Sequence, residues 1–190
     1  MRTSLGMLIA LVVVNSALGQ GLVKIGEAQK RFNVELDLRK FPQDEPAKAL
    51  QSIAVALNSG QLKYMMAHLA DPQFVDQRVA KLAENYRAKQ FPGISPELDP
   101  DLAKKIVAYE DFLVQVRIHF RDDPSLARDL RKLAIASRTG KLKQQDVLAD
   151  AVRGIPKGIV KLSAPSVPGR EAYFQKINDR WYLLNRQVEQ

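Results

Sequence analysis

The strongest constraint on the fold is a β-hairpin pattern near the end of the chain, in residues 170–186. Two runs rich in aromatic and branched aliphatic side chains flank Asn178-Asp179, a pair that can adopt the positive φ angles of a two-residue turn. This turn pairs four sets of residues: Phe174 with Leu183, Lys176 with Trp181, Tyr173 with Leu184, and Gln175 with Tyr182. Both faces are then largely apolar, so we expect one to cover helices and the other to line a cavity or contact another surface.

Three aromatic residues of this hairpin, Tyr173, Trp181 and Tyr182, are therefore candidates for the core or for the wall of a pocket. Trp181 is the single tryptophan of the chain. Because it lies just past the turn, we expect it to anchor the layer between sheet and helices. The other face of the hairpin could contact a second copy of the chain, which would give a homodimer through the sheet.

Residues 1–19 have the pattern of a secretory signal peptide. Arg2 is their only charged residue, an apolar run covers 5–14, and small residues stand at Ala17 and Gly19. We expect cleavage after Gly19 and a secreted or periplasmic location. The apolar run is shorter than the roughly 20 residues that span a bilayer, so an uncleaved anchor is the less favoured alternative.

The composition narrows the class of partner. The chain has no cysteine, which excludes disulfides and a lipid-modified cysteine. Its formal charge is +8, and removal of Arg2 with the signal peptide leaves +7. This balance favours acidic proteins or anionic lipid surfaces, although it also serves solubility. Nucleic acid is not an expected partner of an exported protein. About 170 mature residues suffice for the core of one domain.

Residues 20–43 are expected to form an N-terminal arm or strand. Apolar and polar residues alternate over 32–38, which is the period of a half-buried strand. The alternative is an extended arm along the domain, because Phe41-Pro42 favours an extended backbone.

Residues 44–190 are expected to form a single α+β domain, with helices first and an antiparallel sheet last. Apolar residues at helical spacing predict helices at 44–57, 61–70, 72–91, 101–120 and 126–140. The last of these should turn four side chains inward: Leu126, Leu130, Leu133 and Ser137. Short strands at 147–152 and 159–162 then lead into the hairpin.

The segments ALNSGQL (56–62) and MMAHLAD (65–71) are joined in this chain to the ending FQKINDRWYL (174–183). This combination resembles the nuclear-transport-factor-2-like superfamily, especially its secreted members of lumazine-binding-like type, over roughly two thirds of the mature chain. The resemblance implies a cone, in which N-terminal helices plug a curved antiparallel sheet. A longer helical insert at 91–140 departs from a minimal member. Because the superfamily includes isomerases, dehydratases and hydrolases as well as non-catalytic pockets and assembly domains, fold does not decide function.

Tyr64, His68 and Asp71 are the candidate catalytic residues. Tyr64 and His68 lie one helical turn apart on one face, and Asp71 follows the helix, so the three could form an acid/base set in a pocket. The structural alternative is a packed Tyr64, a hydrogen-bonded His68 and an Asp71 that caps the next helix, and the pattern favours it. We expect no metal and no cofactor, because the histidines are far apart and no calcium, nucleophile or phosphate motif is present.

The most basic stretch suggests a partner-binding surface. On a helix, Arg128, Arg131 and Lys132 surround Ile135 on the face opposite the leucines. An apolar residue within a cationic surface fits an acidic protein or an anionic membrane surface. A solvated outer face is the alternative, and it is the more common case.

The favoured function is an exported, non-catalytic domain that binds a small apolar ligand or a protein. The alternatives are a small-molecule isomerase or dehydratase with its pocket in the cone, and a binder of anionic surfaces through the basic helix. A pocket map distinguishes the first two, because convergent polar groups deep in an apolar cavity favour an enzyme and a purely apolar cavity favours a binder.

Overall fold

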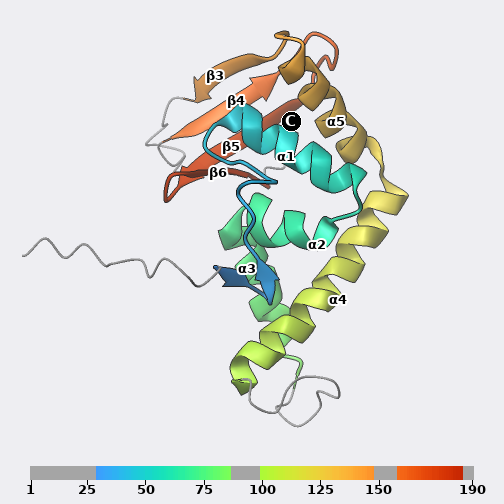
Figure 1. Ribbon diagram of the computed structural model, residues 1–190. Coiled ribbons are helices and arrows are strands. Elements are labelled where there is room, and N and C mark those ends of the chain that lie inside the picture. Colours follow the sequence, from blue (N-terminus) through green and yellow to red (C-terminus); the bar gives the residue numbers. More distant parts are fainter. Residues whose placement is uncertain (1–28, 87–98, 148–157, 186–190) are drawn as a thin grey trace, which may run out of the picture.

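The computed structural model describes residues 29–86, 99–147 and 158–185. Helices precede a C-terminal antiparallel sheet, so the chain has the expected α+β fold (Figure 1). The helices are α1 (Pro46–Asn58), α2 (Leu62–Tyr64), the π-helical turn η1 (Met65–Leu69), α3 (Pro72–Ala83), α4 (Pro100–Asp122) and α5 (Ser125–Arg138). The strands are β1 (Lys30–Arg31), β2 (Val34–Glu35), β3 (Lys143–Val147), β4 (Ile159–Ser163), β5 (Glu171–Ile177) and β6 (Arg180–Leu183).

The main sheet has four antiparallel strands in the order β3-β4-β5-β6. Its last hairpin has the predicted register: Phe174 faces Leu183, Gln175 faces Tyr182, and Lys176 faces Trp181. The turn residues Asn178 and Asp179 have φ angles of 48° and 62°. Such angles match the right-handed twist of the flanking strands, so the chemistry of two turn residues sets the facing of every side chain in the hairpin.

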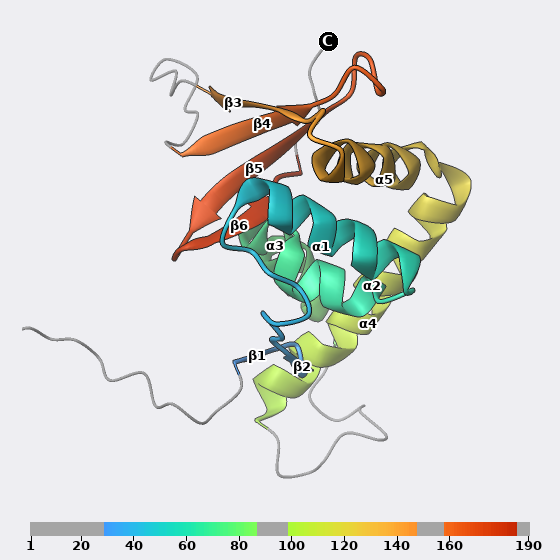
Figure 2. The same ribbon diagram turned by 45° about the horizontal axis from the view of Figure 1, so that its top comes forward.

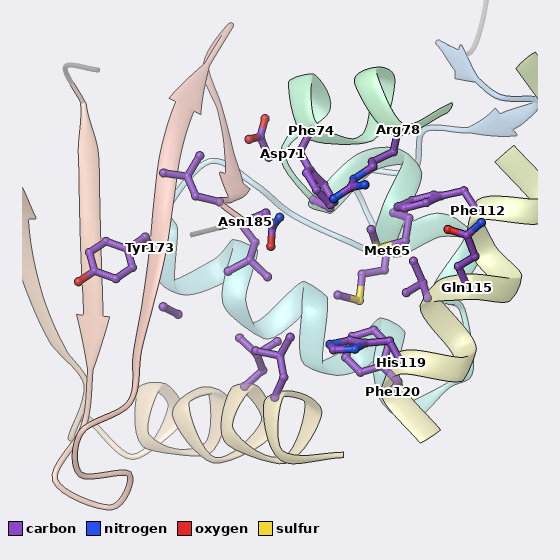
Figure 3. Close-up of a pocket in the computed structure, with 18 of the residues that line it drawn as sticks. Met65, Asp71, Phe74, Arg78, Phe112, Gln115, His119, Phe120, Tyr173 and Asn185 are labelled. Atoms are coloured by element: carbon purple, nitrogen blue, oxygen red, sulfur yellow. The ribbon is translucent and has the colours of Figure 1, made fainter. Parts of the chain in front are cut away.

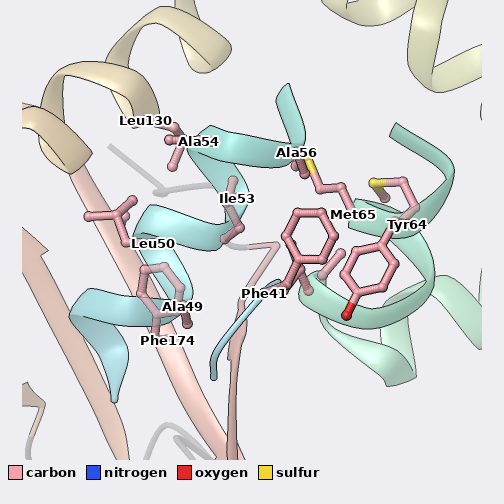
Figure 4. Close-up of a cluster of buried hydrophobic side chains, with 14 of the residues drawn as sticks. Phe41, Ala49, Leu50, Ile53, Ala54, Ala56, Tyr64, Met65, Leu130 and Phe174 are labelled. Carbon is pink, nitrogen blue, oxygen red and sulfur yellow. The ribbon is translucent and has the colours of Figure 1, made fainter. Parts of the chain in front are cut away.

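Helices α1 and α5 cover one face of this sheet (Figures 1 and 2). Leu50 and Ile53 of α1 and Phe174 of β5 are all 0% exposed. Figure 4 shows the side chain of Leu50 lying between Phe174 and Leu130 of α5. One face of the hairpin therefore covers helices, as its apolar pattern predicted.

Helices α3 and α4 pack together away from the sheet, and α4 is the long helix at the lower right of Figure 1. The rings of Phe74 and Phe112 meet edge to face, with centroids 6.3 Å apart. Tyr109 of α4 is fully buried and stacks on Phe32 at 4.4 Å. Helix α4 thereby joins the N-terminal segment to α3.

The prediction of a single strand over 32–38 is wrong. The chain turns at Phe32 and Asn33, whose φ angles are 51° and 61°, so β1 and β2 form a small hairpin. The guanidinium of Arg31 donates to the backbone oxygens of Ala67 and Pro72. These contacts, together with the burial of the Phe32 ring, override the alternating pattern, because a local period is a weak preference beside tertiary packing.

Several boundaries also differ from the sequence patterns. Helix α3 ends at Ala83, whereas 91 was expected, and the Phe91-Pro92-Gly93 stop lies outside the described residues. Strand β3 occupies Lys143–Val147. Of the strand expected at 147–152, only residue 147 belongs to β3, and 148–152 lie outside the described residues. Most side chains of β3 are polar and exposed, so hydrophobic periodicity could not reveal it.

Two side chains are less buried than expected. Leu126 of α5 is 44% exposed, although it was predicted to face inward. Trp181 is half-buried and packs on the margin of the core, so Phe174 rather than Trp181 is the hairpin's core anchor. The predicted signal peptide lies outside the described residues. Within the three described ranges, no helix combines the length and apolarity needed to cross a membrane.

Candidate functional site

A cavity of about 510 Å³ lies where η1, α3, α4, α5 and the β5–β6 hairpin meet (Figure 3). Its deepest lining consists of buried side chains from η1, α4, α5 and β5: Met65, Met66, Phe112, Leu130 and Ala172. Its mouth carries exposed polar side chains: Arg78, Gln115, His119 and Asn185. The site is thus apolar in its depth and polar at its opening.

Two Asp-Pro turns place the helices that form the walls of the cavity. Asp71-Pro72 starts α3, where the Asp71 carboxylate accepts a hydrogen bond from the Gln73 backbone N–H at 2.9 Å. The Asp71 backbone N–H donates to Leu183 O at 2.8 Å, which fastens the start of α3 to β6. On the other side, Asp123-Pro124 ends α4 and turns the chain into α5.

The π-helical turn forms part of the cavity floor. The Ala70 N–H donates to Met65 O at 2.9 Å, which is the five-residue spacing of a π-helix. Met65 and Met66 are both in the cavity lining. Methionine is flexible and polarizable, so a floor of two methionines can adapt to ligands of different shape. Single π-turns are frequent at functional sites. The helical pattern at 61–70 contained no signal that predicted a π-turn.

The charged groups of the lining are already engaged or lie at the mouth. Tyr173 Oη donates to Glu171 Oε2 at 2.6 Å, and Lys161 Nζ lies 3.0 Å from Glu171 Oε1. These two contacts hold the pKa of Glu171 below its ordinary value, and the hydrogen bond from Tyr173 has the larger effect. Arg78 lies over the ring of Phe74, with its guanidinium carbon 5.5 Å from the ring centroid.

The candidate acid/base residues do not converge on the cavity. The rings of Tyr64 and His68 are neighbours, with centroids 5.0 Å apart, but neither residue lines the cavity. Asp71 lines it and serves as the cap of α3. Tyr64 Oη donates to Asp37 O, and His68 Nε2 lies 2.9 Å from Val34 O. The geometry therefore fits the structural alternative for these three residues.

Burial governs the titration of both rings. Removal from water lowers the pKa of His68 and raises the pKa of Tyr64, because the charged form of each is the one that loses solvation. His68 is only 3% exposed, so it is a neutral structural side chain at neutral pH. Among the residues of the three described ranges, no group of three or more histidines and carboxylates could hold a metal ion.

The three aromatic candidates of the hairpin separate. Tyr173 of β5 lines one edge of the cavity, and Figure 3 shows its ring at the left of the view. Trp181 and Tyr182 do not line it. Tyr182 is buried on the face opposite Trp181, since successive side chains of a strand alternate.

The basic face of α5 is only partly as predicted. Arg128 and Lys132 are exposed, and Ile135 on the same face is 55% exposed. Arg131 instead turns toward α1, and its Nε donates to Asn58 Oδ1 at 2.7 Å. The exposed basic face therefore consists of Arg128, Lys132 and Ile135.

The cavity residues Phe74, Phe112 and His119 were not among the predicted site residues. A faint signal exists, because Phe112, Val116 and Phe120 follow one another at i+4 on α4. All three of these side chains line the cavity.

Comparison with known proteins adds no identity, since no family model, curated protein or solved structure matches the chain. The resemblance to the nuclear-transport-factor-2-like superfamily stays a prediction from the residues quoted above. The function must be argued from the cavity itself.

Proposed function

We propose that this chain is an exported, non-catalytic domain that binds a small, largely apolar molecule in the cavity between α3, α4, α5 and the β5–β6 hairpin. The observation that carries the proposal is the division of the lining into a buried apolar depth and an exposed polar mouth. A volume of about 510 Å³ falls in the range of small-molecule sites, and transfer of apolar surface into such a site is favourable by about 25 cal/mol per Å².

Three features support binding over catalysis. The deep lining contributes methionine, phenylalanine, leucine and alanine, none of which transfers protons. Glu171 is paired with Lys161 and Tyr173, so its carboxylate is stabilised as an anion. His119 is exposed at the mouth, away from the apolar depth where a reacting group would be held. A general acid or base must reach the reacting atom within hydrogen-bond distance.

Leu126 offers a direct test of the site. It is 44% exposed and lines the cavity, so a larger side chain there should fill the opening without disturbing the core. We expect the uncharged fluorescent probe N-phenyl-1-naphthylamine to bind the purified protein saturably, and Leu126→Trp to weaken that binding about tenfold or more. Ile135→Trp is the matched control, because Ile135 is an exposed aliphatic residue of the same helix outside the cavity.

Equal probe binding by both tryptophan variants would contradict the proposal, since the probe would then occupy another surface. Organic extraction of the purified protein followed by mass spectrometry would identify a molecule that co-purifies. For export, N-terminal sequencing of protein recovered outside the cytoplasm should begin at Gln20, and a retained Met1 would contradict it.

A further inference from the structure

The mouth of the cavity contains a cation, Arg78, that no carboxylate of the described residues neutralises. Arg78 is exposed on α3 and lines the cavity beside Phe74 (Figure 3). Within the part of the chain that the structure describes, its guanidinium has the ring contact with Phe74 and no ion pair. Arg31 on the neighbouring hairpin, by contrast, pairs with Asp76 of the same helix at 2.8 Å.

The remaining charges at the opening are placed differently. Glu171 is neutralised by Lys161. Asp71 is used as the cap of α3 and lies seven residues before Arg78, which is two helical turns or about 10 Å along the axis. The Asp71 carboxylate is therefore engaged at the first turn of α3, and within the described residues it forms no ion pair with Arg78.

Arg78 is also held in a defined direction. The contact of its guanidinium with the Phe74 ring restricts the side chain and leaves the N–H groups at the edge of the plane available to an acceptor. A planar guanidinium matches the two oxygens of a carboxylate better than an ammonium does. Gln115 and His119, across the opening on α4, add side chains that can donate hydrogen bonds.

We infer that the ligand of this cavity is an amphipathic anion, with an apolar body in the methionine- and phenylalanine-lined depth and a carboxylate at the mouth against Arg78. A chain-like or ring-like monocarboxylate has this chemistry. The inference rests on the proposed function, because it assigns a ligand class to the same cavity. It goes further in that it names the residue that selects the ligand's charge.

Three probes with the same ten-carbon chain separate the possible head groups: decanoate, decan-1-ol and decylamine. Each is titrated at pH 7 and low salt as a competitor of N-phenyl-1-naphthylamine on the purified protein. We expect decanoate to bind more tightly than decan-1-ol. The ratio of their affinities should fall about fivefold in Arg78→Gln, which is near the upper range for an exposed ion pair.

The matched control is Lys81→Gln. It removes one positive charge from an exposed position of α3 that does not line the cavity, so the ratio should stay unchanged. Arg78→Lys should restore part of the preference, because it keeps the charge and loses the planar fork. Raising the salt concentration should weaken decanoate binding and leave decan-1-ol unaffected.

The outcomes separate this inference from the proposed function. If the ratio is the same in Arg78→Gln and the parent protein while the neutral probe still binds, the inference is overturned and the cavity remains an apolar site. If decylamine binds most tightly, the selecting charge is negative, and the inference is likewise overturned. If neither the neutral probe nor any competitor binds, both the inference and the proposed function fail.

Discussion

Gln43 and Trp181 exchange two hydrogen bonds that close the outer edge of the main sheet. The Trp181 N–H donates to Gln43 O at 2.9 Å, and Gln43 Nε2 donates to Trp181 O at 3.1 Å. The same Nε2 group donates to His68 O at 2.8 Å. Gln43 is 1% exposed, so one buried amide joins the segment before α1, the π-turn and β6.

Gln43→Ala should lower the free energy of unfolding by about 1 to 3 kcal/mol, because it leaves the buried His68 carbonyl oxygen and the part-buried Trp181 carbonyl oxygen without this donor. The measurement is a denaturant midpoint at unchanged slope. Gln73→Ala, at an exposed glutamine, should change stability by less than about 0.5 kcal/mol. Equal stability of both variants would show that Gln43 does not hold the edge.

Asp179→Gly should stabilise the protein by about 0.5 kcal/mol. Asp179 has a φ of 62°. Glycine adopts this conformation without steric strain because it has no Cβ atom. The salt bridge that would be lost, between Lys176 and Asp179, is exposed to solvent. Asp179→Val should instead destabilise the hairpin by about 1 kcal/mol or more, since a β-branched residue is strained at positive φ. Thermal unfolding of both variants decides the matter, and the reverse order would contradict it.

Stability should fall as the pH drops below about 6.5, and His68 should cause this fall. Burial lowers the pKa of His68 from 6.5 in the folded protein, so the unfolded chain binds the extra proton first as the pH falls. The stability that neutral His68 contributes is therefore complete above pH 6.5 and is lost progressively below it. The carboxyl groups with lowered pKa values, such as Glu171, act in the same direction but below about pH 4.5.

The free energy of unfolding measured between pH 5 and pH 7 tests this. In His68→Phe, the free energy of unfolding should no longer fall between pH 7 and pH 5, whether the variant is more or less stable than the parent protein. His119→Gln, which replaces the other histidine of the chain at an exposed position, is the matched control. A slope that survives in His68→Phe would assign the effect to another group.

The exposed basic face of α5 should bind anionic vesicles in a salt-dependent way. The double variant Arg128→Gln/Lys132→Gln should reduce vesicle binding with the fold intact, because both side chains are exposed. Lys81→Gln/Lys105→Gln removes the same charge from exposed positions of α3 and α4 and serves as the control. Equal binding by both double variants would leave this face as solvated surface.

Arg131→Gln should instead lower stability by about 0.5 to 1 kcal/mol through loss of the Asn58 hydrogen bond.

Local patterns predicted most of the secondary structure. The register of β5 and β6 follows from Asn178-Asp179 alone, since a two-residue turn leaves one pairing of the flanking strands. The spans of α1, α4 and α5 follow from apolar stripes and from turn signals such as Gly140, which has a φ of 68° just after α5.

Features that depend on distant contacts were missed. The turn at Phe32-Asn33 is stabilised by Arg31 and Tyr109, which lie on different elements. The cavity was expected only as a region behind the hairpin. Its position could not be derived, because it is the space left where Phe112, Leu130 and Ala172 fail to meet, and no single element encodes that space. Tyr64 and His68 were correctly placed side by side, but the cavity opens elsewhere.

The cavity draws its walls from residues as far apart as Met65 and Asn185. A bound molecule that touches η1, α4, α5 and the hairpin together must leave when any one of them detaches. Its binding free energy therefore opposes global unfolding, and at one hundred times Kd it would add about 2.7 kcal/mol to that of the empty protein. Occupancy of the cavity would slow amide hydrogen exchange in the helices and the sheet by a common factor. The bound molecule would then be part of the cooperative folding unit.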